Sequence, residues 1–131
     1  MTKRRKWGPV VAWMAVIFFL SAQAHLPTPG QHWLDFVVEK SAHALEYAVL
    51  AALLLRALGN RDRERWRAFG VAVLLAWFYA LTDEFHQRFV PGRAADWSDI
   101  LFDWLGAVAG AGLWLHAWTA RHKAAWSSDE A

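Results

Sequence analysis

Long apolar segments separated by short charged connections run through the whole chain. The segment from Trp7 to Ala24 has no charged residue and approaches the ~20 residues that a helix needs to cross a bilayer. Two further segments, from about Trp66 to Phe89 and from about Asp96 to Trp118, have similar lengths. These three patterns predict membrane-spanning helices.

A fourth segment, from about Lys40 to Leu58, is less apolar because its first turns hold Lys40, His43 and Glu46. These residues recur at steps of three, which places them on one face of a helix, while leucine and valine cover another. The periodicity therefore predicts a spanning helix with a polar face at its beginning.

Polar and small residues also line one face of the last segment. Such a stripe has to face protein rather than lipid, because ionisable groups in hydrocarbon are costly without partners. Two glycines four positions apart allow two membrane helices to approach closely. The stripe consists of Asp96, Asp99, Asp103, Gly106 and Gly110, at three- and four-residue steps.

The distribution of Lys and Arg predicts how the helices are oriented. Basic residues concentrate at the N-terminus, between the second and third helices and at the C-terminus, and only Lys40, Arg88 and Arg93 lie on the other side. Because positively charged connections stay in the cytoplasm, we predict an all-α integral membrane four-helix bundle with both termini cytoplasmic. Its regions are the basic N-terminus 1–6, the transmembrane domain 7–120 and the polar cytoplasmic tail 121–131.

A cleaved secretory signal is the alternative for the first segment. A basic flank, a short apolar core and Ala22-Gln23-Ala24 fit that template. We favour a membrane span, because three further candidate spans follow and because the core carries the bulky residues Trp13 and Phe18-Phe19.

The composition agrees with a membrane protein. The 131 residues are 56% hydrophobic and include ten Trp, which is too apolar for an ordinary soluble domain of this size. The absence of Cys excludes disulfides and thiolate metal ligands. The pI near 9.3 does not indicate nucleic-acid binding, because the basic residues flank apolar segments. We therefore expect membrane lipid as a partner and the cell membrane as the location, and oligomerisation stays open.

The predicted topology brings the unusual polar residues to one side of the membrane. The first and third helices end at the extracytoplasmic face and the second and fourth begin there. A turn and a short interfacial segment from His25 to Glu39, which contains Pro, Gly and aromatic residues, would partly cover the cluster. The cluster consists of Lys40, His43, Glu46, Tyr47, Asp83, Glu84, His86, Gln87, Arg93, Asp96, Asp99 and Asp103.

Three hypotheses account for this cluster, and the first is structural. In a lattice of ion pairs, Lys40 and Arg93 would only neutralise the carboxylates, since charges buried in a membrane pair with one another. Such pairs are a costly way of joining helices.

The second hypothesis is a divalent metal site. His43-x-x-Glu46 and Asp83-x-x-His86 each place an imidazole and a carboxylate one helical turn apart, an arrangement with which helix bundles hold metals. An isolated pair of this kind is more often a local hydrogen bond. The candidate metal ligands are His43, Glu46, Asp83, His86, Asp99 and Asp103.

The third hypothesis is a site for an anionic substrate. Arg93 and Lys40 would bind a phosphate or carboxylate, and His43 with Glu46 would transfer a proton. The chain has no Gly-rich phosphate loop, nucleophile elbow or zincin motif, so the reaction type stays open. The candidate catalytic residues are His43, Glu46, Asp83, Glu84 and His86, and the candidate substrate-binding residues are Lys40, Tyr47, Gln87, Arg93 and Asp99.

At these positions the chain resembles the VanZ-like family of small membrane proteins. The resemblance extends from Ser21 to about Gly110, and at Asp103 the family often has Asn. It is carried by Lys40-x-x-His43-x-x-Glu46-Tyr47, by Asp83-Glu84-x-His86-Gln87 with Phe89-Val90-Pro91-Gly92-Arg93, and by Asp99 with Gly106.

The resemblance implies a helical membrane protein with a shared polar site. The member that gives the family its name is associated with teicoplanin resistance. For that member, the resemblance implies an effect on how a glycopeptide antibiotic acts at the cell surface. We therefore hypothesise an outward-facing pocket that binds or processes an anionic envelope component, either lipid-linked or derived from peptidoglycan, with a glycopeptide as another candidate ligand. A binding protein without turnover and a transporter are the alternatives, and whether the protein is an enzyme stays open.

Overall fold

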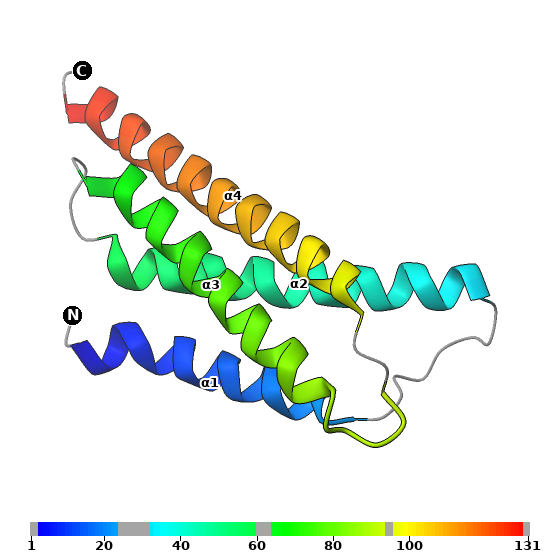
Figure 1. Ribbon diagram of the computed structural model, residues 1–131. Helices are drawn as coiled ribbons and strands as arrows, with labels where there is room; N and C mark the ends of the chain where they lie inside the picture. Colours follow the sequence, from blue (N-terminus) through cyan, green and yellow to red (C-terminus); the bar gives the residue numbers. More distant parts are fainter. Residues whose placement is uncertain (1–2, 24–31, 60–63, 94–95, 130–131) are drawn as a thin grey trace.

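Four helices make up the described part of the chain, residues 3–23, 32–59, 64–93 and 96–129 of the computed structural model. The predicted all-helical fold is therefore confirmed. The helices are α1 (Lys3–Ser21), α2 (His32–Leu58), α3 (Arg65–Gln87) and α4 (Trp97–Asp129), as Figure 1 shows.

Three of these helices are long and apolar enough to cross a membrane. They cover Trp33–Leu58, Arg65–Gln87 and Trp97–Arg121. The helix α1, predicted as a further span, does not reach this standard within the described residues. Its basic residues extend to Lys6, so that its uncharged part is shorter than the ~20 residues that a span needs.

The helix α2 begins at His32, well before the predicted start at Lys40. The proline and glycine residues of the preceding segment end at Gly30, and neither residue type recurs inside the helix to interrupt it. The second half of the predicted separate segment is therefore part of α2, because residues 32 to 39 continue into it as one helix. Its position at the membrane interface stays a prediction. Its first half, 24–31, lies outside the described residues.

The helix α4 also continues beyond the predicted end of its span at Trp118, as far as Asp129. The extension contains no Pro or Gly and is rich in Ala, so it favours a helix. In Figure 1 both the beginning of α2 and the end of α4 project from the bundle.

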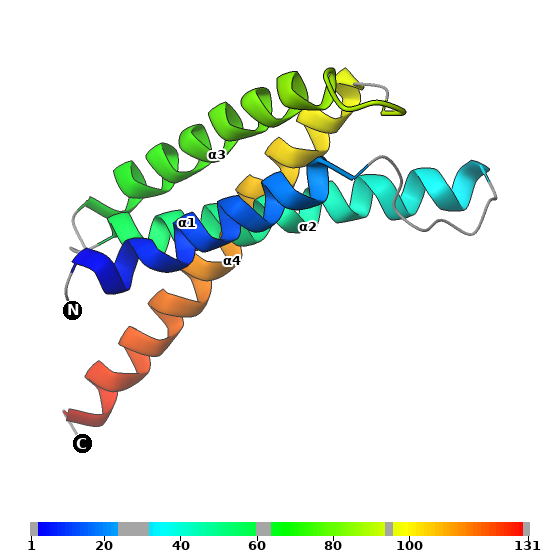
Figure 2. The ribbon, with the colours of Figure 1, turned by 90° about the horizontal axis from the view of Figure 1, so that it is seen from below.

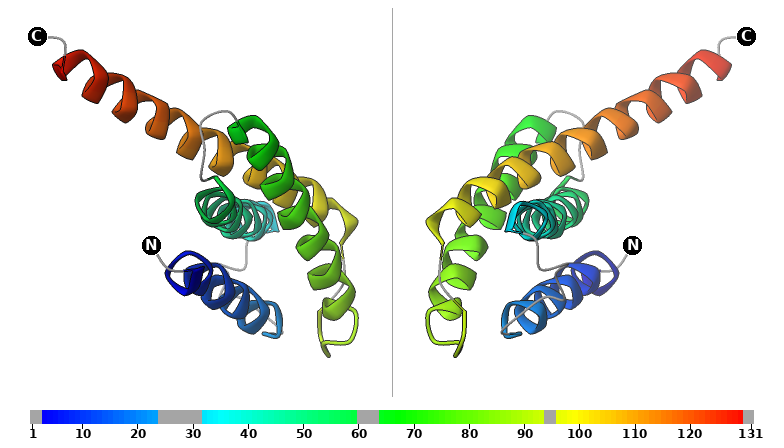
Figure 3. Two further views of the ribbon diagram at one scale, coloured as in Figure 1. Left: turned by 90° about the vertical axis from the view of Figure 1, so that its left-hand side faces the viewer. Right: turned by 90° about the vertical axis from the view of Figure 1, so that its right-hand side faces the viewer.

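The helix α2 is the centre of the bundle and contacts each of the other three helices, most extensively α4. Figure 3 views α2 nearly along its axis, with α1 on one side and α3 and α4 on the other. Figure 2 shows α1 lying along α2. Residues on α2 are therefore placed where they can meet side chains of every other helix.

Two glycines bring α4 against the backbone of α2. A Cβ atom at Gly106 would collide with the Ala44 backbone, and one at Gly110 with the Ala48 backbone. The small-residue spacing predicted for close approach is therefore used inside the molecule, between α2 and α4.

Hydrogen bonds to main-chain carbonyls attach α1 to the bundle. The Trp13 indole donates to the Glu46 carbonyl at 2.9 Å, and the Tyr79 hydroxyl donates to the Met14 carbonyl at 2.8 Å. Pro9 lies inside α1 and has no N–H to offer the carbonyl one turn earlier. The Arg56 guanidinium donates to that carbonyl, on Arg5, at 3.5 Å.

The two halves of the bundle differ in character. One half has an apolar core, which includes Leu50, Leu55, Ala72, Ala76 and Ala111. At the other end α1 and α3 end and α4 begins, and there the buried residues are largely polar. We call this second region the polar end.

The glycine contact can be tested with a matched pair of substitutions. Gly106→Ala should destabilise the protein by about 1–3 kcal/mol or more, because the added methyl overlaps the Ala44 backbone and overpacking costs that much. Gly112→Ala, where no atom lies within 4 Å of the added methyl, should be neutral or stabilising. Thermal unfolding in detergent measures both, and equal melting temperatures would contradict the predicted contact.

Candidate functional site

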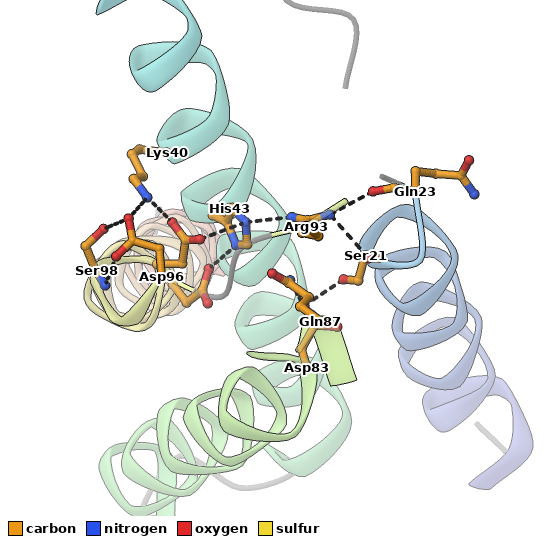
Figure 4. A network of polar contacts seen from close by, with 11 residues as sticks. Ser21, Gln23, Lys40, His43, Asp83, Gln87, Arg93, Asp96 and Ser98 are labelled. Carbon is orange, nitrogen blue, oxygen red and sulfur yellow. Dashed lines mark hydrogen bonds and ion pairs between the residues drawn. The ribbon is translucent and has the colours of Figure 1, made fainter. Parts of the chain in front are cut away.

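The polar end holds a network of polar contacts that joins all four helices and the connection between α3 and α4. Figure 4 shows side chains from each helix pointing toward one another around His43 and Arg93. The members with a described hydrogen bond are Ser21, Gln23, Lys40, His43, Asp83, Gln87, Arg93, Asp96, Ser98, Asp99 and Asp103.

Lys40 on α2 is paired with two carboxylates at the start of α4. Its ammonium donates to Asp96 Oδ2 at 2.8 Å and to Asp99 Oδ1. Lys40 and Asp99 are both buried, so each charge needs the other. Lys40 was predicted to bind an anionic substrate, and in the structure its charge already serves this ion pair.

Asp96 also caps the first turn of α4. Its Oδ1 accepts from the Ser98 N–H at 2.9 Å, and its Oδ2 accepts from the Ser98 hydroxyl at 2.7 Å. The first of these contacts satisfies a backbone N–H that has no partner within the helix at its N-terminus. The hydrogen bonds from Lys40 and then from Ser98 hold the pKa of the Asp96 carboxyl well below its usual range, because both stabilise the ionised form.

His43 lies one turn after Lys40 and contacts α4 and Arg93. Its Nδ1 is 3.0 Å from Asp103 Oδ1, and its Nε2 is 3.3 Å from Arg93 Nη2. A guanidinium only donates, so Nε2 is the acceptor and the ring proton is on Nδ1, where it is donated to Asp103. The predicted partner of His43 was Glu46, whereas the hydrogen bond joins it to Asp103.

A tight turn delivers Arg93 to this position. Gly92 has φ of 83°, Pro91 precedes it, and the Arg93 N–H donates to the Val90 carbonyl at 3.2 Å. This is a type II turn, in which Gly at the third position accommodates the positive φ. The conformation of this turn therefore explains why Pro91, Gly92 and Arg93 occur together in the motif quoted for the family resemblance.

Arg93 also holds the end of α1. Its Nη1 lies 3.3 Å from the Ser21 carbonyl and 3.3 Å from the Gln23 carbonyl. The last carbonyls of a helix have no partner within it and attract a cation. Arg93 thus connects the end of α1 to His43 on α2.

Asp83 on α3 meets the same end of α1. Its Oδ2 accepts from the Ser21 hydroxyl at 2.7 Å and from the Gln87 amide at 3.0 Å. Several buried polar atoms nearby have no hydrogen-bond partner among the described residues. They are Tyr47 OH, Asp83 Oδ1, Glu84 Oε1, His86 Nδ1 and Gln87 Oε1.

A narrow pocket opens between α1, α2 and the turn that carries Arg93. Its volume is about 10 Å³, which is enough for about one water molecule. It is lined by Leu20, Ser21, Ala42, His43, Glu46 and Arg93.

The structure does not bring all the predicted site residues to this pocket. His86 stacks on Phe18 with ring centroids 4.5 Å apart, and Tyr47 is fully buried beside Tyr79. Asp83 hydrogen bonds to Ser21 and Gln87, and no hydrogen bond is described between it and His86.

Four contributors were not predicted as site residues, and one of them is Gln23, whose main-chain carbonyl accepts from Arg93. Ser21 and Ser98 bond to network carboxylates, and their signal is weak because a serine is common at a helix end. Glu39 lies close to His43 and Asp99. The spacing Glu39-x-x-x-His43 could have indicated it, had α2 been predicted to begin before Lys40.

Comparison with known proteins agrees with these motifs. The family model described as VanZ/LLP1 matches residues 7–119. The chain belongs to the VanZ/LLP1 family. No curated protein and no solved structure matches the chain. The resemblance predicted from the sequence is thus confirmed. Several of the residues quoted for it, including Lys40, His43 and Arg93, belong to the network at the polar end.

The ion pair between Lys40 and Asp99 predicts that a single substitution destabilises the protein more than the matching double substitution. Lys40→Met should destabilise the protein by about 3–5 kcal/mol, because it leaves the buried Asp99 carboxylate without a counter-charge. Lys40→Met combined with Asp99→Asn should recover much of this loss, since residue 99 then carries no charge that needs a partner. Unfolding in mixed micelles measures both variants, and a double variant no more stable than the single one would contradict the pairing.

Proposed function

We propose that this VanZ/LLP1-family protein binds or processes an anionic component of the cell envelope at its polar end, which would face outward. The supporting observation is that a guanidinium and an imidazole with a fixed proton line one pocket. Arg93 and His43 both border it, and Asp103 accepts the His43 Nδ1 proton.

In this proposal Arg93 binds the anion. Arg offers a planar set of donors that matches a phosphate or carboxylate. The pocket holds about 10 Å³, so only a small group, such as one oxygen of the anion, would enter it. The remainder of a lipid-linked or peptidoglycan-derived ligand would lie outside the pocket.

His43 is the proposed proton-transfer group. An imidazole whose Nδ1–H is held by a carboxylate presents Nε2 as a base, and here Asp103 supplies that carboxylate. Glu46 was the predicted partner, and it remains close because it lines the same pocket. An incoming anion that displaced Arg93 Nη2 would expose Nε2 for this role.

A binding protein without turnover is the second candidate. The Ser21 hydroxyl lines the pocket and donates to Asp83, a contact that joins α1 to α3. Such a protein would shield an envelope component and could in that way affect a glycopeptide antibiotic directed at it. Transport through one copy is disfavoured, because the core of the other half, including Leu50, Leu55 and Ala111, is apolar.

The anion-binding role predicts a difference between two arginines of the polar end. Arg93→Gln should lower the amount of co-purified anionic envelope component at least about tenfold, because a charge-assisted hydrogen bond contributes about 1.5–3 kcal/mol. Arg88→Gln removes the same charge from an exposed residue outside the pocket and should have little effect. Mass spectrometry of gently extracted protein measures both.

Equal capture by the two arginine variants would contradict this assignment. A captured component that remains chemically unchanged during incubation with wild-type protein would favour the binding protein over the enzyme.

We further propose that the shorter helix α1 also crosses the membrane, so that the chain crosses it four times. Both termini would then be cytoplasmic, with the basic connections lying inside. The absence of Cys allows single labelled sites. Arg88→Cys should react with a membrane-impermeant thiol reagent added to intact cells, and Glu64→Cys should react only after permeabilisation. The reverse pattern would place the polar end in the cytoplasm and refute the outward-facing pocket.

A further inference from the structure

We propose that the polar end binds a divalent first-row metal ion through Glu39, His43 and Asp99. Each residue offers one ligand atom, and these atoms lie within 4.8 Å of one another. His43 and Asp99 are buried, and Glu39 is half-buried beside them. Of these three, Glu39 was not among the ligands predicted from the sequence.

The hydrogen bonds of His43 and Asp99 leave suitable atoms for the metal. His43 Nδ1–H is donated to Asp103, so the lone pair is on Nε2. Metal-bound histidines usually donate their other N–H to a carboxylate in this way. Asp99 Oδ1 accepts from Lys40, which leaves Oδ2 available.

The separation of these two atoms also fits a shared metal ion. His43 Nε2 and Asp99 Oδ2 are 3.6 Å apart, too far for a hydrogen bond. Two ligands with bonds of about 2.0–2.2 Å to one tetrahedral metal lie roughly 3.3–3.6 Å apart. Glu39 then supplies the third protein ligand.

The charge of the polar end favours a bound cation. Its carboxylates outnumber the cations Lys40 and Arg93, and burying unpaired carboxylates is costly. Glu84 adds a buried oxygen, Oε1, that has no hydrogen-bond partner among the described residues. A divalent ion would offset this excess.

The ligand types narrow the choice of metal. One imidazole nitrogen with carboxylate oxygens suits Zn²⁺ or Mn²⁺, whereas Ca²⁺ and Mg²⁺ prefer oxygen ligands alone. We therefore expect Zn²⁺ or Mn²⁺ to bind more tightly than Mg²⁺.

Arg93 and the metal would use the same lone pair. Arg93 Nη2 lies 3.3 Å from His43 Nε2, so metal binding has to release this contact. The released guanidinium would stay attached to α1 through Nη1 and face the pocket beside the metal. An anion could then bind both, and this last step alone rests on the proposed function.

Calorimetry of the full-length protein, stripped with a chelator and titrated in micelles with Zn²⁺ and then Mn²⁺, tests the site. We expect about one equivalent to bind. Glu39→Gln should weaken binding at least tenfold, and Asp103→Asn should weaken it about 10–100-fold through the orientation of His43. Asp35→Asn, one turn earlier on the same helix, is the matched control and should bind as the wild type does.

Absence of stoichiometric binding, or equal affinities of Glu39→Gln and wild type, would overturn the metal site. Arg93→Gln separates this inference from the proposed function, because it should bind metal at least as tightly as wild type while losing the anionic component. Anion capture without metal binding would refute the metal site alone, and metal binding without anion capture would refute the proposed function alone.

Discussion

The contact between α2 and α4 determines how the rest of the polar end is arranged. Gly106 and Gly110 allow α4 to touch the backbone of α2 at Ala44 and Ala48. Both helices begin at the polar end and run in the same direction, so this contact sets the register of the turns before it. That register is what places Asp99 and Asp103 opposite Lys40 and His43. A shift along α4 by one turn would change which carboxylate meets Lys40 and which meets His43.

The charges of the network are arranged in two layers. Lys40 neutralises the outer carboxylates, Asp96 and Asp99, and this part of the site behaves as the structural lattice that sequence analysis offered as one hypothesis. The inner part, around His43, differs, because among the described residues Asp103 is hydrogen bonded to the His43 imidazole and to no Lys or Arg. An excess of negative charge therefore remains next to the pocket. The lattice and a ligand site are compatible, because Asp99 uses Oδ1 for Lys40 and leaves Oδ2 available.

Sequence analysis predicted correctly which helix faces meet, but it did not predict which side chains pair across them. Helical periodicity depends on local spacing, and it put Lys40, His43 and Asp99 on surfaces that do meet. The choice of partners depends on the register between helices, so the preference of His43 for Asp103 over Glu46 could not be derived from spacing. Sequence analysis also gave α2 too late a start, because it assigned the residues up to Glu39 to a separate interfacial segment, although nothing from His32 onward interrupts the helix.

Arg93 links the local turn to the chemistry of the whole site. Its guanidinium spans two elements, with Nη1 on the α1 carbonyls and Nη2 on His43. A ligand that takes the place of His43 at Nη2 would leave the α1 contacts in place, so binding need not separate α1 from the bundle. Because Arg93 already stands where it would act, little side-chain freedom is lost on binding. The turn at Gly92 is therefore as important to the site as the charge of Arg93, because the turn positions that side chain.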